Sequence, residues 1–130
     1  MSSYTVVNLL ELPDVVGDRA PEIEGRFARD AIGSRDLGVS HWRYAPGYRS
    51  GLGHTHREQE EAYVVVAGSG QVLLDGEVRE VGQWDVIRVA PEVFRAWEAG
   101  PDGLELIAIG GPKPPEGDGS PGPAQWPQGE

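Results

Sequence analysis

The chain contains no cysteine, so disulfide bonds, thiolate metal sites and cysteine nucleophiles are all excluded. Basic residues are scarce as well: 11 Lys and Arg stand against 21 Asp and Glu, which gives a formal net charge of -10. Such a charge repels phosphate backbones and anionic membrane surfaces, so neither nucleic acid nor a membrane is an expected partner. Any metal site must use histidine and carboxylate ligands.

The sequence also lacks an apolar run of the roughly 18 residues that a membrane-spanning helix needs. Residues 1–12 do not have the basic-then-apolar layout of a signal peptide, and we therefore expect a cytoplasmic protein. The 130 residues suit one compact domain and are too few for two independent cores.

Short segments rich in Val, Ile, Tyr, Trp and Leu alternate with Gly, Pro, Asp and Ser between about residues 26 and 109, which predicts an all-β domain. The clearest hairpin joins 71–74 to 77–81 through Asp75-Gly76, which supplies the positive φ angles of a type I′ turn. Many short strands with frequent turns favour a sandwich or barrel. Further strands are expected at 39–44, at 62–67 with a stop at Gly68-Ser69-Gly70, at 85–89 and at 104–109.

The two ends of the chain are harder to assign. Residues 1–24 are expected to form an N-terminal extension or a first strand; both helix and strand are open for 20–32, and a strand beginning near Gly25 is favoured. Residues 111–130 are rich in Gly and Pro, which predicts a C-terminal tail without regular structure. A lone aromatic in this tail, Trp126, would pin it either to the barrel or to a neighbouring subunit.

His54 and His56 are two residues apart and therefore share one face of a strand, where two imidazoles can chelate one ion. A nearby carboxylate would complete a set of two His and one acid, which leaves open positions on a divalent metal for substrate or oxygen. Strand parity continued from His56 selects Glu60, whereas a bend within the polar residues 57–60 would reset the register and select Glu61. The spacing alone leaves both carboxylates open.

Segment 53–70 resembles the first characteristic motif of the cupin superfamily, H-x-H-x4-E-x6-G, filled here by His54, His56, Glu61 and Gly68. The resemblance covers roughly residues 47–110. It implies a small single-domain cupin, a jelly-roll-like double-stranded β-barrel, at 25–110. It also selects Glu61 as the third ligand of one divalent ion, with Fe, Mn, Ni and Zn not distinguishable. Tyr63 shares the parity of Glu61, so its hydroxyl should point into the barrel, where it would bind substrate.

The second cupin motif, in essence G-x5-P-x-G-x2-H, is poorly matched, because Trp84, Ala90 and Arg95 stand at its first glycine, its proline and its histidine. An arginine stays protonated and cannot ligate, so the site has at most three protein ligands. Three arrangements of Arg95 are then open. It turns away from a three-ligand metal, it pairs with Glu61 in place of the metal, or it binds an anionic substrate through two hydrogen bonds next to the metal without ligating the metal itself. The third histidine, His41, is expected to be a structural strand residue.

These residues support three functional hypotheses. The first is a metal-dependent enzyme, of dioxygenase or isomerase type, acting on a small anionic, oxygen-rich or aromatic molecule. The second is a metal-free barrel that binds or senses a small ligand, with Arg95 replacing the fourth metal ligand. The third is a degenerate barrel kept for its oligomer interface. A homodimer is expected under all three, because pairing covers unsatisfied strand edges.

Overall fold

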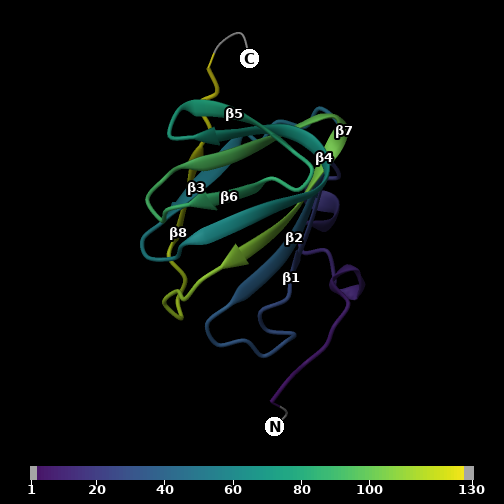
Figure 1. Ribbon diagram of the computed structural model, residues 1–130, viewed down its shortest axis with the longest axis vertical. Helices are drawn as coiled ribbons and strands as arrows, with labels where there is room; N and C mark the ends of the chain where they lie inside the picture. The colour runs from purple at the N-terminus through teal and green to yellow at the C-terminus, as the bar shows by residue number, and fades with distance from the viewer. Residues whose placement is uncertain (1–2, 128–130) are drawn as a thin grey trace.

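The computed structural model describes residues 3–127, and their backbone forms a curled antiparallel sheet of eight strands (Figure 1). Two short 3-10 helices, η1 (Leu9–Glu11) and η2 (Gly17–Arg19), precede the sheet. Among the described residues there is no helix of the length and hydrophobicity needed to cross a membrane. The strands are β1 (Ile23–Phe27), β2 (Gly38–Tyr44), β3 (Leu52–His56), β4 (Glu61–Leu74), β5 (Glu77–Gly82), β6 (Val86–Val89), β7 (Arg95–Gly110) and β8 (Gly119–Pro123).

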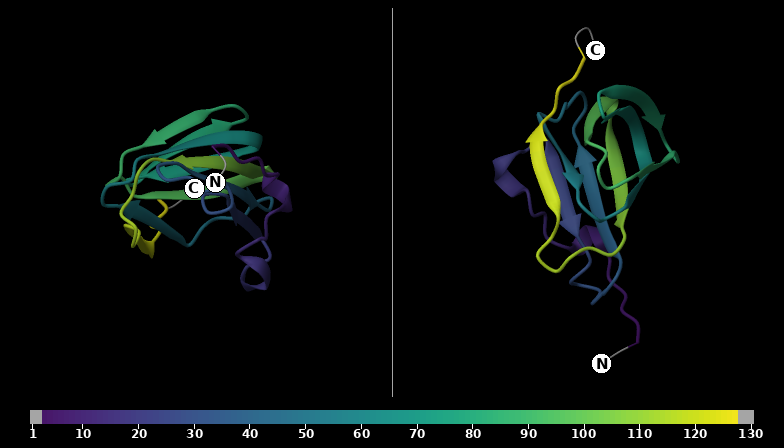
Figure 2. Two further views of the ribbon diagram at one scale, coloured as in Figure 1. Left: turned by 90° about the horizontal axis from the view of Figure 1, so that it is seen from below. Right: turned by 90° about the vertical axis from the view of Figure 1, so that its left-hand side faces the viewer.

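The curled sheet forms a barrel with two walls. The long strands β4 and β7 join these walls, because each strand has one half in one wall and the other half in the second wall. Residues 104–110 of β7 pair with β2 on one side and with the start of β4 on the other. Residues 95–99 of β7 pair with the end of β4, and β3 meets the same part of β7. β1 and β6 complete one wall, while β5 and β8 complete the other, and the sheet curls between them (Figure 2).

The core lies between these walls because successive side chains of a strand point to opposite faces. On β7, Leu104, Leu106 and Ala108 are buried in the core. The intervening Glu105 side chain accepts a hydrogen bond from His41 on the outer face of the sheet, over a distance of 2.6 Å to Nε2. His41 is therefore a buried residue of β2 that lies outside the barrel interior, as expected of a structural strand residue.

The predicted hairpin is confirmed, whereas two predicted strand limits were wrong. Asp75 and Gly76 both have positive φ, and Leu74 pairs with Glu77 across the turn. However, β4 continues through residues 68–70 to Leu74, and β7 begins at Arg95 rather than near 104. In β4, Gly68 and Gly70 were expected to end a strand, but they lie at an irregularity within one continuous strand. A Cβ on Gly68, whose φ is 76°, would lie 2.1 Å from the carbonyl oxygen of Gly103.

The prediction that the C-terminal tail lacks regular structure was wrong. Gly119–Pro123 forms β8, which pairs antiparallel with β3 from Leu52↔Pro123 to His56↔Gly119. Its prolines are compatible with a strand because β8 lies at an edge, where alternate N–H groups need no partner strand. Beyond β8, the Trp126 indole donates to the carbonyl of Ser50 and its ring lies 4.7 Å from the guanidinium carbon of Arg49. Trp126 thus pins the segment to its own barrel.

Gly53 marks a close approach of β3 to β7, next to His54. A Cβ at this position would lie 2.2 Å from the carbonyl oxygen of Arg95, a backbone atom that cannot swing aside. We expect Gly53→Ala to push the strands apart and to lower the free energy of unfolding by about 1–3 kcal/mol. Gly51→Ala is the matched control, because no atom lies within 4 Å of its added Cβ. Equal urea midpoints for the two variants would contradict this close packing.

Candidate metal centre and cavity

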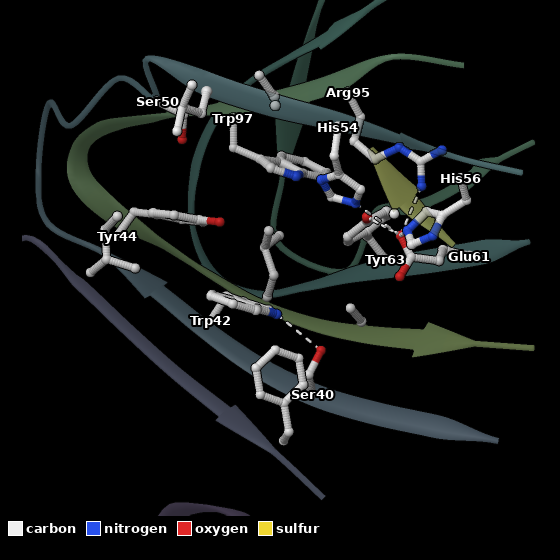
Figure 3. A pocket seen from close by; sticks show the side chains of 18 of the residues that line it. Ser40, Trp42, Tyr44, Ser50, His54, His56, Glu61, Tyr63, Arg95 and Trp97 are labelled. Carbon is white, nitrogen blue, oxygen red and sulfur yellow. Dashed lines mark hydrogen bonds and ion pairs between the residues drawn. The ribbon is translucent and has the colours of Figure 1, made fainter. Parts of the chain in front are cut away.

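A cavity of about 820 Å³ lies between the two walls and combines a broad aromatic lining with one cluster of polar groups. Figure 3 shows the polar cluster on one side and Tyr44 and Ser50 on the other, with Trp97 between them. Ring packing holds the lining in place: Tyr63 packs on Trp97 and Phe27 stands edge-on to Trp42. The aromatic residues that line the cavity are Phe27, Trp42, Tyr44, Tyr48, Tyr63 and Trp97.

The polar cluster is built from the end of β3 and the start of β4. His54 and His56 project from β3, and Glu61 is the first residue of β4. The chain leaves the strand conformation between residues 57 and 60, and this bend brings Glu61 to the two imidazoles. Glu61 Oε1 lies 3.7 Å from His54 Nε2 and 3.4 Å from His56 Nε2. Glu60 instead forms an exposed ion pair with Arg88.

The donor set fits a divalent ion. Metal–nitrogen and metal–oxygen bonds of about 2.0–2.2 Å place neighbouring ligand atoms about 3 Å apart, so the side chains of the cluster would move toward one another around an ion. One donor atom from each of His54, His56 and Glu61 already lies within 4.8 Å of the others. Among the described residues, His56 Nε2 is buried and has no hydrogen-bond partner. A buried nitrogen without a partner is costly unless something else satisfies it, and a metal ion would do so.

Glu61 is held as a carboxylate by its neighbours. Its Oε1 accepts hydrogen bonds from the Tyr63 hydroxyl and from Arg95 Nη1, the latter at 2.7 Å. Burial alone would raise the pKa of the Glu61 carboxyl, but the nearby His54 imidazole, the hydrogen bond from the Tyr63 hydroxyl and the positive charge of Arg95 outweigh it and lower the pKa to about 2. Burial, and then the Glu61 charge, raise the pKa of the Tyr63 hydroxyl, which therefore remains a neutral donor.

Arg95 does not turn away from the cluster, so the first of its three predicted arrangements was wrong. Its side chain has no exposed surface, and besides Glu61 it binds the carbonyl oxygens of Ala90, Pro91 and Val93. These bonds use most of the N–H groups of Arg95, so too few remain for bidentate hydrogen bonding to a substrate. A carboxylate has about four acceptor positions, so the two bonds on Glu61 Oε1 leave room for an ion.

Asp118 is a site residue that the sequence analysis missed. It lies just before β8, its side chain is fully buried, and Oδ1 lies 2.8 Å from His56 Nδ1. Oδ2 accepts hydrogen bonds from the backbone N–H groups of Glu58 and Gln59. Burial raises the pKa of the Asp118 carboxyl, but the bonds from Glu58, His56 and Gln59 outweigh it and leave the pKa well below its usual range.

Comparisons with known proteins bear on the fold. No family model matches the chain, and no curated protein sequence matches it at a significant level. Among solved structures, a cupin protein from Bacteroides fragilis has a TM-score of 0.71 and 22% identity, covering 88% of this chain and 89% of its own. The polyketide cyclase RemF from Streptomyces resistomycificus has a TM-score of 0.73 and 17% identity, covering 95% and 87%.

A third solved structure is a variant of salicylate 1,2-dioxygenase from Pseudoaminobacter salicylatoxidans in complex with gentisate. It has a TM-score of 0.65 and 17% identity, and the match covers 76% of this chain and 27% of the dioxygenase. Identities of this size carry the fold and not the activity. The all-β, jelly-roll-like barrel predicted from the sequence is thereby confirmed: the chain has the cupin fold.

Proposed function

We propose that this chain is a metal-dependent cupin enzyme that acts on a small planar molecule bearing oxygen atoms, with one divalent ion held by His54, His56 and Glu61. One observation carries the proposal: the cluster of three donors lies in the wall of a cavity lined by six aromatic side chains. Three protein ligands leave coordination positions open for substrate. The aromatic lining suits the flat, apolar faces of the same molecule.

The charges around the centre favour an anionic or oxygen-rich substrate. Glu61 and Asp118 are negative and Arg95 is positive, so a dication would leave the centre with one net positive charge. A bound ion would supply Lewis-acid chemistry toward substrate oxygen atoms. Tyr63 and Arg95 remain the proposed substrate-binding residues in two different ways: Tyr63 would contact the substrate, whereas the buried Arg95 would act on it through its charge and through its hold on the Glu61 carboxylate.

The names of two structures with the same fold agree with this substrate class. The salicylate 1,2-dioxygenase variant carries gentisate, a hydroxylated aromatic acid, and RemF is a polyketide cyclase. For this chain we propose a reaction of the dioxygenase or isomerase type. A homodimeric state, a cytoplasmic location and the lack of nucleic-acid and membrane partners stay predictions.

A second candidate function is a metal-free barrel that binds a small ligand. The observation that favours it is the buried pair of Arg95 with Glu61, because a guanidinium 2.7 Å from the carboxylate already supplies positive charge where an ion would. The two candidates differ in whether ligand binding requires a metal.

Calorimetric titration with catechol tests the proposal, since catechol offers two oxygen atoms on a planar ring. Protein loaded with Zn²⁺ is expected to bind catechol in a saturable manner, whereas metal-free protein is not. The matched control ligand is cis-cyclohexane-1,2-diol, which has the same two oxygen atoms without a planar ring, and it should bind more weakly. Equal binding of catechol with and without metal would favour the second candidate. A stronger response to the diol would contradict the planar substrate.

A further inference from the structure

Asp118 contacts both parts of the chain that create the donor cluster. Its Oδ1 lies 2.8 Å from Nδ1 of His56. Its backbone carbonyl accepts from the N–H of Arg57, and Oδ2 accepts from the next two N–H groups, those of Glu58 and Gln59. Asp118 therefore joins the bend between β3 and β4, which brings Glu61 to the histidines, to the ring of one histidine.

We propose that Asp118 is a positioning residue that holds His56 in the tautomer with its proton on Nδ1, so that Nε2 keeps its electron pair for a metal ion. The inference rests on the proposed function in treating His56 as a ligand. An ionised carboxylate only accepts hydrogen bonds, so the short contact requires a proton on Nδ1. A neutral imidazole then has its lone pair on Nε2, the buried atom without a partner that lies 3.4 Å from Glu61 Oε1.

The geometry around Asp118 explains why a carboxylate is required rather than an amide. In Asp118→Asn, the amide oxygen must occupy the place of Oδ2, because two backbone N–H groups point at that position. The amide NH₂ group would then face His56 Nδ1 and donate to it. This arrangement moves the imidazole proton to Nε2, where it blocks the electron pair that would bind an ion.

The test compares full-length wild type with Asp118→Asn and with Glu116→Gln. Glu116 lies in the same segment and loses the same charge, but its side chain is exposed and makes only a 3.7 Å contact with Arg57. Zn²⁺ titration is expected to show affinity about 10–100-fold weaker for Asp118→Asn, and near wild type for Glu116→Gln. Nitrogen-15 NMR of the imidazoles in metal-free protein is expected to show His56 protonated on Nδ1 in wild type and on Nε2 in Asp118→Asn.

The NMR measurement decides the inference even if Asp118→Asn fails to fold, because the wild-type tautomer is itself predicted. A wild-type His56 with its proton on Nε2, or with protons on both nitrogens, would overturn the role of Asp118. A folded Asp118→Asn with wild-type Zn²⁺ affinity would overturn it as well. If wild type binds no metal, the proposed function fails, while a tautomer that changes in Asp118→Asn still supports the action of Asp118 on His56.

Discussion

Replacing Arg95 with methionine is expected to lower the free energy of unfolding by about 3–5 kcal/mol. The arginine side chain has no exposed surface, and its loss leaves the largely buried Glu61 carboxylate without its cationic partner. The carbonyl oxygens of Ala90, Pro91 and Val93 lose their donor at the same time. Methionine fills much of the volume but supplies no hydrogen bond. Urea denaturation of the metal-free proteins measures the difference.

Arg88→Met is the matched control for this prediction. Arg88 also pairs with a glutamate, Glu60, but both side chains are more than half exposed, so its replacement should cost about 1 kcal/mol or less. The response of Arg95→Met to Zn²⁺ distinguishes the loss of the Arg95 charge from the loss of its packing. Once Arg95 is gone, a dication meets less repulsion and becomes the partner that Glu61 lacks, so Zn²⁺ should stabilise Arg95→Met more than wild type. Equal stability of the two arginine variants would refute the importance of the buried pair.

The second large effect is expected from the double variant His54→Ala, His56→Ala. Wild-type protein purified without chelator should contain about one equivalent of a divalent metal, and the variant should contain almost none, because two of three ligands are removed. Elemental analysis of untagged protein measures both. His41→Gln serves as the histidine control, since His41 bonds Glu105 outside the cavity and its variant should keep the metal.

Two results would argue against the metal centre. Metal in the double variant at the wild-type level would place the ion elsewhere on the protein. Wild-type protein without metal, even after incubation with Fe²⁺, Mn²⁺, Ni²⁺ or Zn²⁺, would exclude the metalloenzyme and leave the metal-free ligand-binding barrel as the better function.

The parts of the molecule that the sequence predicted are those encoded locally. Asp75-Gly76 specifies its turn through its own φ angles, and the neighbouring strands follow from it. The two histidines and Glu61 lie within eight residues of one another, so one motif was enough to select them. Strand parity alone was ambiguous, because the bend that resets the register is held by Asp118, a residue far along the chain.

The parts that the sequence did not predict depend on long-range pairing. The contact of Arg95 with Glu61 requires β7 to cross beside β4 and β3 at a particular register, which no local pattern contains. The role of Asp118 could not be predicted for a related reason. Its segment is rich in Gly and Pro and predicts a loop, and only pairing with β3 turns residues 119–123 into an edge strand.

The pairing of β3 has a consequence for the order in which the protein is made. β3 meets β7 at one residue pair, His54 with Arg95, but pairs along its whole length with β8. Of the described strands, β8 is synthesised last, and joining it to β3 closes a loop of about 60 residues, a slow step for a folding chain. The strand that carries both histidines therefore gains its full-length partner only after the other described strands have been synthesised, and an ion held by the proposed ligands would bind to a strand that is completed late.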